Sequence, residues 1–123
     1  MTIRLNHTIV SAHNKQDAAR WFADVFGLAF VEADADHFAP VRVNDTLTLL
    51  FADAASFDAQ HYAFHVSDAE FDAILGRVKD KGLAFGSAPW SRSDRKLNDW
   101  GGGRGVYFET PDSHLMELMT VPQ

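Results

Sequence analysis

Gly27-Leu28-Ala29-Phe30 and Gly82-Leu83-Ala84-Phe85 are one tetrapeptide repeated 55 residues apart, and this repeat decides the fold. A glycine supplies the left-handed backbone that ends a helix. Before each glycine, apolar residues recur at the i, i+3, i+4 and i+7 spacing of one helical face: Ala18, Trp21, Phe22 and Val25 in the first copy, and Phe71, Ile74, Leu75 and Val78 in the second. The sequence therefore predicts two helices, each closed by a glycine.

A strand precedes each predicted helix. His7 opens the run His-Thr-Ile-Val-Ser-Ala, and His61 opens His-Tyr-Ala-Phe-His-Val, 54 residues later. Both runs have the composition of strands. Asn14 is placed to cap the first helix, and Ser67-Asp68-Ala69-Glu70 is a capping box for the second. Strand, helix and closing glycine thus recur at nearly constant spacing, which indicates a duplicated unit.

Further strands follow each glycine. In the first half we predict three strands with a tight turn at Asn44-Asp45: Leu28–Ala33, Phe38–Val43 and Thr46–Phe51. In the second half we predict a strand that starts at Leu83–Phe85, a long loop at Ser87–Gly103, and a hairpin turned by Pro111-Asp112-Ser113 with strands at Gly105–Glu109 and His114–Thr120. The predicted fold is α+β, with two βαβββ modules at about 1–53 and 59–123 of a single domain, residues 1–123. Its mixed sheets curl, with the helices outside and a cleft between the sheets.

Composition narrows the class of protein. Hydrophobic residues make up 46% and charged residues 23% of the 123 residues, which is an ordinary globular balance. There is no cysteine, so disulfides, thiolate ligands and cysteine nucleophiles are excluded. The net charge of −6 argues against a nucleic-acid partner, and no apolar run reaches the roughly 20 residues of a membrane span. We expect a cytoplasmic protein whose partner is a small molecule.

His7 and His61 are the first candidates for chemistry, because they hold the same place in the two copies. If a pseudo-twofold axis relates the copies, the two imidazoles converge and could share a metal ion. The competing interpretation is a core or edge role, which is more common for a lone strand histidine. His65 is excluded from the same ion, since four residues along a strand span about 13 Å; we expect it to line a cavity or to serve the structure.

Glu117 is the third candidate ligand. It lies in Leu115-Met116-Glu117-Leu118-Met119, where both strand faces are apolar, so its carboxylate points into a region of low polarity. Burying a carboxylate is costly unless a metal or a cation faces it; the alternative is an edge strand that leaves Glu117 in water. Its first-half counterpart is near Leu50, which cannot bind a metal. Two histidines and one carboxylate predict a divalent ion with open positions, namely Fe(II), Mn(II), Zn(II) or Ni(II).

The chain resembles the vicinal-oxygen-chelate superfamily, which includes glyoxalase I, extradiol dioxygenases, fosfomycin-resistance thiol transferases and bleomycin-resistance proteins. The resemblance covers essentially the whole chain and rests on five segments: Leu5-Asn6-His7, Phe26-Gly27-Leu28, His61-Tyr62-Ala63-Phe64, Gly105-Val106-Tyr107-Phe108, and Pro111-Asp112-Ser113-His114 leading to Glu117. It implies paired βαβββ modules, a homodimer, and metal ligands at the same His7, His61 and Glu117.

Two departures from relatives bear on the activity. Either Leu49 or Leu50 stands where four-ligand glyoxalase I enzymes carry an acid, which counts against that activity. Thr8 lies one residue after His7, whereas fosfomycin transferases place a threonine two residues after their first histidine. Those enzymes also carry basic residues beyond the glutamate, and residues 118–123 have none. Lyase or isomerase, dioxygenase and thiol-transferase reactions all remain compatible with the scaffold.

The long loop carries the candidate substrate-binding residues. Trp90 and Trp100 could close over an apolar or aromatic substrate, while Arg92, Arg95 or Arg104 meets a carboxylate or phosphate. Gly101-Gly102-Gly103 would give such a lid the freedom of a hinge. The competing interpretations are a solvated or disordered loop and a dimer contact.

Tyr107 and Arg104 are the candidate catalytic residues. Tyr107 alternates with Val106 and Phe108, so it could face the cleft as a proton donor; a packed core tyrosine is the competing interpretation. The leading hypothesis is a divalent-metal-dependent enzyme whose ion chelates two neighbouring oxygens of a small substrate, which could be anionic. The alternative is a non-catalytic drug- or metabolite-binding protein of the bleomycin-resistance type.

Overall fold

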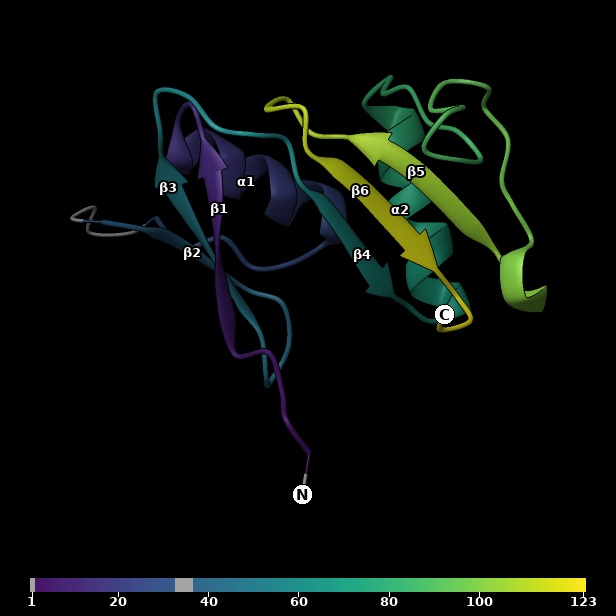
Figure 1. Ribbon diagram of the computed structural model, residues 1–123, viewed down its shortest axis with the longest axis horizontal. Helices are drawn as coiled ribbons and strands as arrows, with labels where there is room; N and C mark the ends of the chain where they lie inside the picture. Colours follow the sequence, from purple (N-terminus) through teal and green to yellow (C-terminus); the bar gives the residue numbers. More distant parts are fainter. Residues whose placement is uncertain (1, 33–36) are drawn as a thin grey trace. The chain divides into compact units, whose positions relative to one another are not determined.

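The fold is built from two compact units (Figure 1). The computed structural model describes residues 2–32 and 37–123, and the units are Met1–Asp58 and Ala59–Gln123. The first unit holds β1 (His7–Ala12), α1 (Lys15–Phe26), β2 (Ala39–Arg42) and β3 (Thr48–Asp53). The second holds β4 (His61–His65), α2 (Asp68–Asp80), the short 3₁₀ helix η1 (Trp100–Gly102), β5 (Gly105–Glu109) and β6 (Leu115–Met119). The predicted α+β class with a duplicated unit is confirmed, and the grouping into a single domain stays a prediction.

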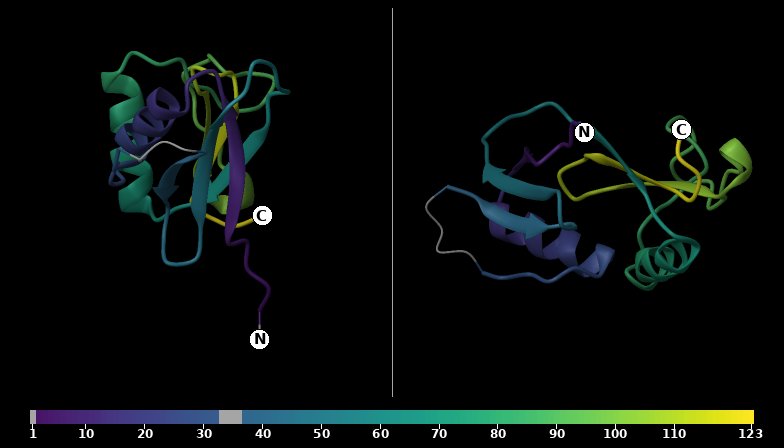
Figure 2. Two further views of the ribbon diagram at one scale, coloured as in Figure 1. Left: turned by 90° about the vertical axis from the view of Figure 1, so that its left-hand side faces the viewer. Right: turned by 90° about the horizontal axis from the view of Figure 1, so that it is seen from below.

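Both units have the same sheet topology. In the first, β3 lies between β1 and β2, parallel to β1 and antiparallel to β2. In the second, β6 lies between β4 and β5, parallel to β4 and antiparallel to β5. Each helix lies on one face of its own sheet (Figure 2). The first and last strands of each unit are therefore neighbours, which joins residues that are far apart in the sequence.

The helix boundaries follow the predicted signals. The Asn14 side chain accepts a hydrogen bond of 3.0 Å from the backbone of Asp17 and caps α1. Ser67 and Glu70 form both bonds of the capping box at the start of α2. Gly27 and Gly82 have φ angles of 71° and 68°, the left-handed conformation in which glycine has no steric penalty. These four sites confirm the predicted helix ends.

The strand predicted directly after each helix is not formed. Residues 28–32 have no strand, and Ala33 lies outside the described residues. The apolar side chain of Val31 is 71% exposed, so it does not pack this segment against the core. In the second unit Leu83–Phe85 is also irregular, and Gly86 makes only one bridge, to Tyr107. The loop residue Ser91 lies so close to Gly86 that a Cβ at Gly86 would collide with the Ser91 carbonyl. The loop therefore folds back at Gly86, where the bridge to β5 ends.

Both predicted turns are present. The Asn44 side chain accepts hydrogen bonds from the backbone of Thr46 and Leu47, at 2.9 and 3.0 Å. At the other turn Ser113 adopts a φ of 69°, and the backbone N–H of Thr110 donates to the carbonyl of His114 over 2.9 Å. The second turn sets β5 and β6 in register.

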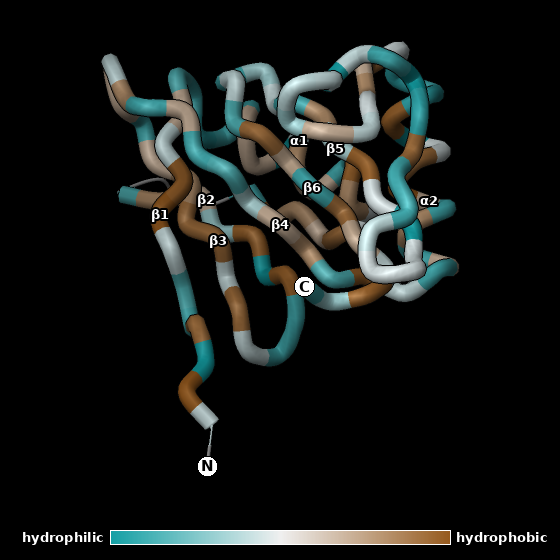
Figure 3. Tube along the Cα trace, turned by 45° about the vertical axis from the view of Figure 1, so that its right-hand side comes forward, coloured by the Kyte–Doolittle hydropathy of each residue, from teal (hydrophilic) through white to brown (hydrophobic). Residues whose placement is uncertain are grey.

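Each sheet has one face that belongs to the core. In the first unit the side chains buried on this face are Val10, Ala12, Ala39, Val41, Leu49 and Phe51. In the second they are Val106, Phe108, Met116 and Leu118. Figure 3 shows apolar colouring along most of β3 and β6. The opposite faces carry His7 in the first unit and His61 and Glu117 in the second, so the polar candidates share the faces that do not pack on the helices.

Neither α1 nor α2, nor any other helix within the described residues, has the length and apolar character needed to cross a membrane.

Candidate functional site

The strand register of the second unit brings His61 and Glu117 into contact. Glu117 on the central strand β6 pairs with Ala63 of β4, and His61 lies two residues before Ala63 on the same face. From this diagonal position the imidazole Nε2 of His61 lies 2.9 Å from Oε1 of Glu117. Two residues separated by 56 positions thus form one polar pair.

Tyr107 is the third member of this cluster. It pairs with Glu117 from the other side, on β5, and its hydroxyl donates a hydrogen bond to the Glu117 carboxylate. Burial raises the pKa of Tyr107, and the hydrogen bond and the charge of Glu117 raise it further. The hydroxyl therefore keeps its proton at neutral pH and acts as a donor. Tyr107 is buried, as a packed core tyrosine would be, and it also faces the candidate ligand Glu117, as a proton donor would.

The Glu117 carboxylate is 5% exposed, as the apolar residues around it predict. Of the described residues, no lysine or arginine pairs with it. Its partners are the imidazole of His61 and the hydroxyl of Tyr107. A buried carboxylate without a fixed cation calls for a positive partner, which is either a protonated imidazole or a metal ion.

His61 and Glu117 fit a divalent ion as two of its ligands. Imidazole nitrogen and carboxylate oxygen bind such ions at about 2.0–2.2 Å, so two adjacent donors lie about 3 Å apart. The 2.9 Å between Nε2 and Oε1 agrees with that separation. Among residues 59–123, all of which the structure describes, no third histidine, aspartate or glutamate joins the pair. The second unit by itself therefore offers two of the three predicted ligands.

His7 holds in the first unit the position that His61 holds in the second. It opens β1 and pairs with Thr48 at the start of β3, as His61 pairs with Leu115 at the start of β6. Its ring is exposed, and Nδ1 lies 2.8 Å from the side-chain oxygen of Asn6. A hydrogen bond at one ring nitrogen orients the other nitrogen toward a further partner. The role of His7 as a ligand stays a prediction.

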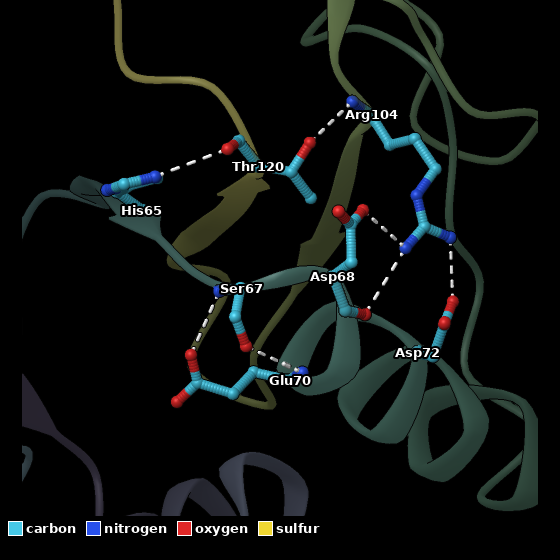
Figure 4. A network of polar contacts seen from close by, with 7 residues as sticks. All are labelled: His65, Ser67, Asp68, Glu70, Asp72, Arg104 and Thr120. Carbon is cyan, nitrogen blue, oxygen red and sulfur yellow. Dashed lines mark hydrogen bonds and ion pairs between the residues drawn. The ribbon is translucent and has the colours of Figure 1, made fainter.

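His65 is bound elsewhere. Its Nε2 lies 3.2 Å from the backbone carbonyl of Thr120 (Figure 4). This contact ties the end of β4 to the residue that follows β6, which fits the structural role expected for His65.

Arg104 lies against α2 (Figure 4). Its guanidinium donates to Asp72 over 2.6 Å and to Asp68 over 3.0 Å, and it stacks 4.4 Å above the ring of Phe71. The hydrogen bond to Asp72 is the main cause of its raised pKa. The backbone N–H of Arg104 donates to the Thr120 hydroxyl. The structure therefore places this side chain in contacts that hold β5 to α2, and does not bring it to the His61–Glu117 pair.

Trp90 and Trp100 lie together in the long loop and lead to Tyr107. The centroids of the two indole rings are 6.2 Å apart, and the centroid of Trp100 is 5.9 Å from that of Tyr107 in an edge-on arrangement. The centroid of Tyr107 is in turn 5.9 Å from that of His61. The structure thus groups both predicted tryptophans with the polar pair on β4 and β6.

The guanidinium of Arg92 is paired within the loop and its strand. It donates to Oε1 of Glu109 over 2.7 Å and to the carbonyl of Pro89 over 2.6 Å. Glu109 stands on the same face of β5 as Tyr107, two residues further along. Arg92 therefore lies near the candidate site, with its charge balanced by a carboxylate.

The long loop is held by hydrogen bonds instead of being irregular throughout. Asp94 accepts from the backbone of both Ser87 and Lys96, each over 3.0 Å, and also from the Ser87 hydroxyl. Asn98 forms both backbone bonds of a bridge to Gly105, and its side chain donates to the carbonyl of Ser87 over 2.9 Å. The loop expected to be a hinged lid is thus bound along β5.

Two positioning residues were not predicted as such. Asn98 anchors the loop, and His114 accepts a hydrogen bond of 3.0 Å at Nδ1 from the backbone N–H of Gln60, the residue before His61. His114 is 1% exposed. Its place directly after the Pro111-Asp112-Ser113 turn was visible in the sequence, but nothing there indicated that it would reach β4. Asn98 gave no signal beyond its position before a glycine run.

Comparisons with known proteins agree with the resemblance. The family model for the Glyoxalase/Bleomycin resistance protein/Dioxygenase superfamily matches residues 4–118. A solved structure named Oxidase ChaP-H2 shares 41% sequence identity with a TM-score of 0.92, covering 99% of this chain and 96% of that protein. Oxidase ChaP-H1 shares 40% identity with a TM-score of 0.90, covering 98% of each chain.

More distant structures share the fold. The fosfomycin resistance protein FosX from Mesorhizobium loti is 24% identical, with a TM-score of 0.69, and the match covers 99% of this chain and 95% of FosX. A search among curated proteins gave no match.

Proposed function

The chain belongs to the glyoxalase/bleomycin resistance protein/dioxygenase superfamily, and from this membership and the site geometry we propose a metal-dependent oxidase acting on a small molecule. The proposed ligands of the ion are His7, His61 and Glu117. The observation that carries the proposal is the 2.9 Å contact between His61 and the buried carboxylate of Glu117.

Oxidation is the reaction that the comparisons favour. The two solved structures at 41% and 40% identity are both named oxidases. FosX is 24% identical to this chain, and this likeness supports a shared fold without supporting a shared reaction. Leu50 also stands where a fourth, acidic ligand would be needed for glyoxalase I chemistry. A lyase, isomerase or thiol-transferase reaction is therefore less well supported than an oxidase.

The proposed metal is Fe(II), Mn(II), Zn(II) or Ni(II), and oxidation by molecular oxygen favours Fe(II) or Mn(II) among them, because these ions change oxidation state readily. The bound ion would supply a Lewis acid for two neighbouring oxygens of the substrate and a route for electrons to oxygen. His61 and Glu117 would hold it, each through the atom that now faces the other.

The side chains around the pair would prepare it for this task. Tyr107 keeps its proton and donates to Glu117, which fixes the orientation of the carboxylate and its charge. Trp100 packs edge-on against the Tyr107 ring from the loop side. The Glu117 carboxylate thus lies in a buried environment, where electrostatic interactions are stronger than in water, while the His61 ring remains partly exposed.

Metal binding tests the ligand assignment. Metal-depleted protein is titrated with Mn(II), and the free ion is measured by electron paramagnetic resonance. We expect His7→Ala, His61→Ala and Glu117→Gln each to weaken binding by about 100-fold or more, because loss of even an outer-shell partner costs about 10–100-fold. His65→Ala is the matched control, on the same strand and face as His61, and should bind as the wild type does. Unchanged affinity in His61→Ala and Glu117→Gln would refute the site.

Oxygen consumption tests the reaction. Protein loaded with Fe(II) is given substrates with two adjacent hydroxyls, and oxygen uptake is followed with an electrode. Uptake that depends on Glu117 supports the oxidase. Turnover without oxygen uptake would point to a lyase or isomerase. Tight binding of the same compounds in chelator, with no turnover under any condition, would favour the non-catalytic binding protein.

Assembly and location also belong to the proposal. A chain of 123 residues buries a limited core, so association into a homodimer would add stability. Sedimentation of the wild type at micromolar concentration tests this, and a monomer would contradict it. We further propose that the protein acts in the cytoplasm, which fractionation of cells would test.

A further inference from the structure

A series of aromatic rings leads from the exposed indoles of the long loop, through the buried Tyr107, to the candidate metal ligands. We infer that Trp90 and Trp100 form a subsite on which a neutral, planar aromatic part of the substrate stacks. This inference rests on the proposed function. The inference names the chemical class of the substrate, which the oxidase proposal leaves open.

The exposure of the two indoles points to a ligand. Trp90 is 80% exposed and Trp100 is 36% exposed, although tryptophan is among the side chains that gain most from burial. Their centroids lie 6.2 Å apart with the planes inclined by 36°, so the two rings form one open apolar surface. Two adjacent exposed indoles contribute little to the stability of the fold and offer a surface for stacking.

This surface is continuous with the polar pair inside the second unit. Trp100 meets Tyr107 edge-on at 5.9 Å, and the Tyr107 hydroxyl donates a hydrogen bond to Glu117. A ring bound on the indoles therefore lies along the path that ends at the carboxylate. An aromatic substrate with oxygens at one end could reach both features.

The loop holds the indoles in place before any ligand binds. Asn98 bridges to Gly105 of β5, and its side-chain oxygen accepts the backbone N–H of Trp100 over 3.2 Å. On the other side of Trp90, the Arg92–Glu109 pair fixes the loop to β5. Because little side-chain and loop freedom is lost on binding, a preorganised surface of this kind binds more tightly than a mobile lid.

The arginines of the long loop and the arginine directly before β5 already make contacts of their own, which favours a neutral ring over an anionic one. Arg92 is neutralised by Glu109, Arg104 is bound by Asp68 and Asp72, and Arg95 stacks on Phe85 at 4.9 Å. The guanidinium groups that were expected to meet an anion thus already have partners. A substrate carboxylate or phosphate would have to displace an ion pair at Arg92 or Arg104, whereas a neutral ring needs only the apolar surface.

Two matched probes test this inference. The naphthalenediol with adjacent hydroxyls and the same diol carrying one sulfonate are titrated calorimetrically into metal-free protein in chelator. We expect the neutral diol to bind, and Trp90→Ala and Trp100→Ala each to weaken it by about tenfold, which corresponds to about 1.4 kcal/mol of stacking. Trp21→Phe is the control, because Trp21 is the remaining tryptophan and lies on α1 in the first unit.

The sulfonated probe tests the charge argument. We expect it to bind at least about tenfold more weakly than the neutral diol, and we expect Glu109→Gln, which releases Arg92, to narrow this difference. Equal or tighter binding of the sulfonate by the wild type would overturn the assignment of a neutral substrate.

Other outcomes would overturn the subsite itself. If both Trp90→Ala and Trp100→Ala bound the diol with wild-type affinity, the subsite would be refuted. It would also be refuted if Trp90→Ala changed the sedimentation of the protein and left diol binding intact, because the indoles would then be a contact between subunits. Because chelator is present throughout, a failure of the metal assignment in the Mn(II) titration leaves these results unaffected, and the two failures are distinguishable.

Discussion

Leu50 occupies in β3 the register position that Glu117 occupies in β6. Leu50 pairs with Ile9 of β1 and Pro40 of β2, and Glu117 pairs with Ala63 of β4 and Tyr107 of β5. The duplicated units have therefore kept a histidine at the start of the first strand and differ at the position that faces it. A carboxylate is present in one copy and an apolar side chain in the other.

Substitution of Leu50 by glutamate should add a ligand. In Leu50→Glu the new carboxylate would stand to His7 as Glu117 stands to His61, and we expect Mn(II) to bind about tenfold more tightly, the gain of about 1.4 kcal/mol from one further contact. The measurement is the same titration of metal-depleted protein. Ala52→Glu is the control, since Ala52 lies on the same strand and face, two residues after Leu50. Equal affinities in the two variants would show that the register equivalence does not extend to the side chains.

Removal of the Tyr107 hydroxyl should destabilise the protein more than removal of the Tyr62 hydroxyl. Tyr107→Phe takes a donor from the buried Glu117, and we expect a loss of about 1–3 kcal/mol in the free energy of unfolding, measured with urea in chelator. The Tyr62 hydroxyl has no hydrogen-bond partner among the described residues, so Tyr62→Phe should be nearly neutral. In a double-mutant cycle Glu117→Gln should remove most of the difference. Equal costs for the two tyrosines would contradict the hydrogen bond.

His114 should position β4 through one acceptor atom. His114→Ala removes the partner of the Gln60 N–H and leaves a cavity at a fully buried site, for which we expect a loss of about 2–4 kcal/mol in unfolding free energy. Because the contact with Gln60 positions His61, we also expect His114→Ala to weaken the binding of Mn(II). Asparagine can present an oxygen close to the position of Nδ1, so His114→Asn should recover part of the stability and of the Mn(II) affinity that His114→Ala loses. A His114→Asn variant no better than His114→Ala in either measurement would show that only the volume of the ring matters.

The contribution of Glu70 to stability should depend on pH in the acid range. Its pKa is lowered, chiefly by the hydrogen bond from the backbone of Ser67, from the ordinary value of 4.5. Because the folded pKa lies below the unfolded one, this stabilisation is complete above the unfolded pKa and is lost as pH falls through the folded pKa. The difference in unfolding free energy between wild type and Glu70→Gln should be constant from about pH 6 to 8 and shrink below about pH 5. Ser67→Ala in place of the wild type should abolish this trend; a gap that stays constant to about pH 3 would contradict it.

The fold was predictable wherever the signal was local. Asn14, Gly27 and the Ser67–Glu70 box act on their own helix ends, and each does in the structure what the sequence indicated. The strand expected at Leu28–Ala33 was wrong over residues 28–32, because strand propensity does not reveal whether a neighbouring strand or a core is present to receive the segment.

The contacts of the candidate site residues were predictable only in part. The repeat singled out His61, and the apolar surroundings of Glu117 indicated its burial, which the structure confirms. The partners of Arg104 could not be foreseen, since Asp68 and Asp72 lie 36 and 32 residues away and only the packing of α2 beside β5 brings them together. The metal itself, and the ligand role of His7, stay predictions.

The parallel pairing of the first and last strands has a consequence for synthesis on the ribosome. β1 can find β3 once residue 53 has emerged, so the first unit can close while the rest of the chain is still being translated. β4 must wait for β6, and His61 meets its neighbour Leu115 only after 54 further residues. During that interval the apolar edge of β4 is unprotected, and the slow closure of so long a segment makes the second unit the stage at which a nascent chain is most exposed to aggregation and most dependent on chaperones.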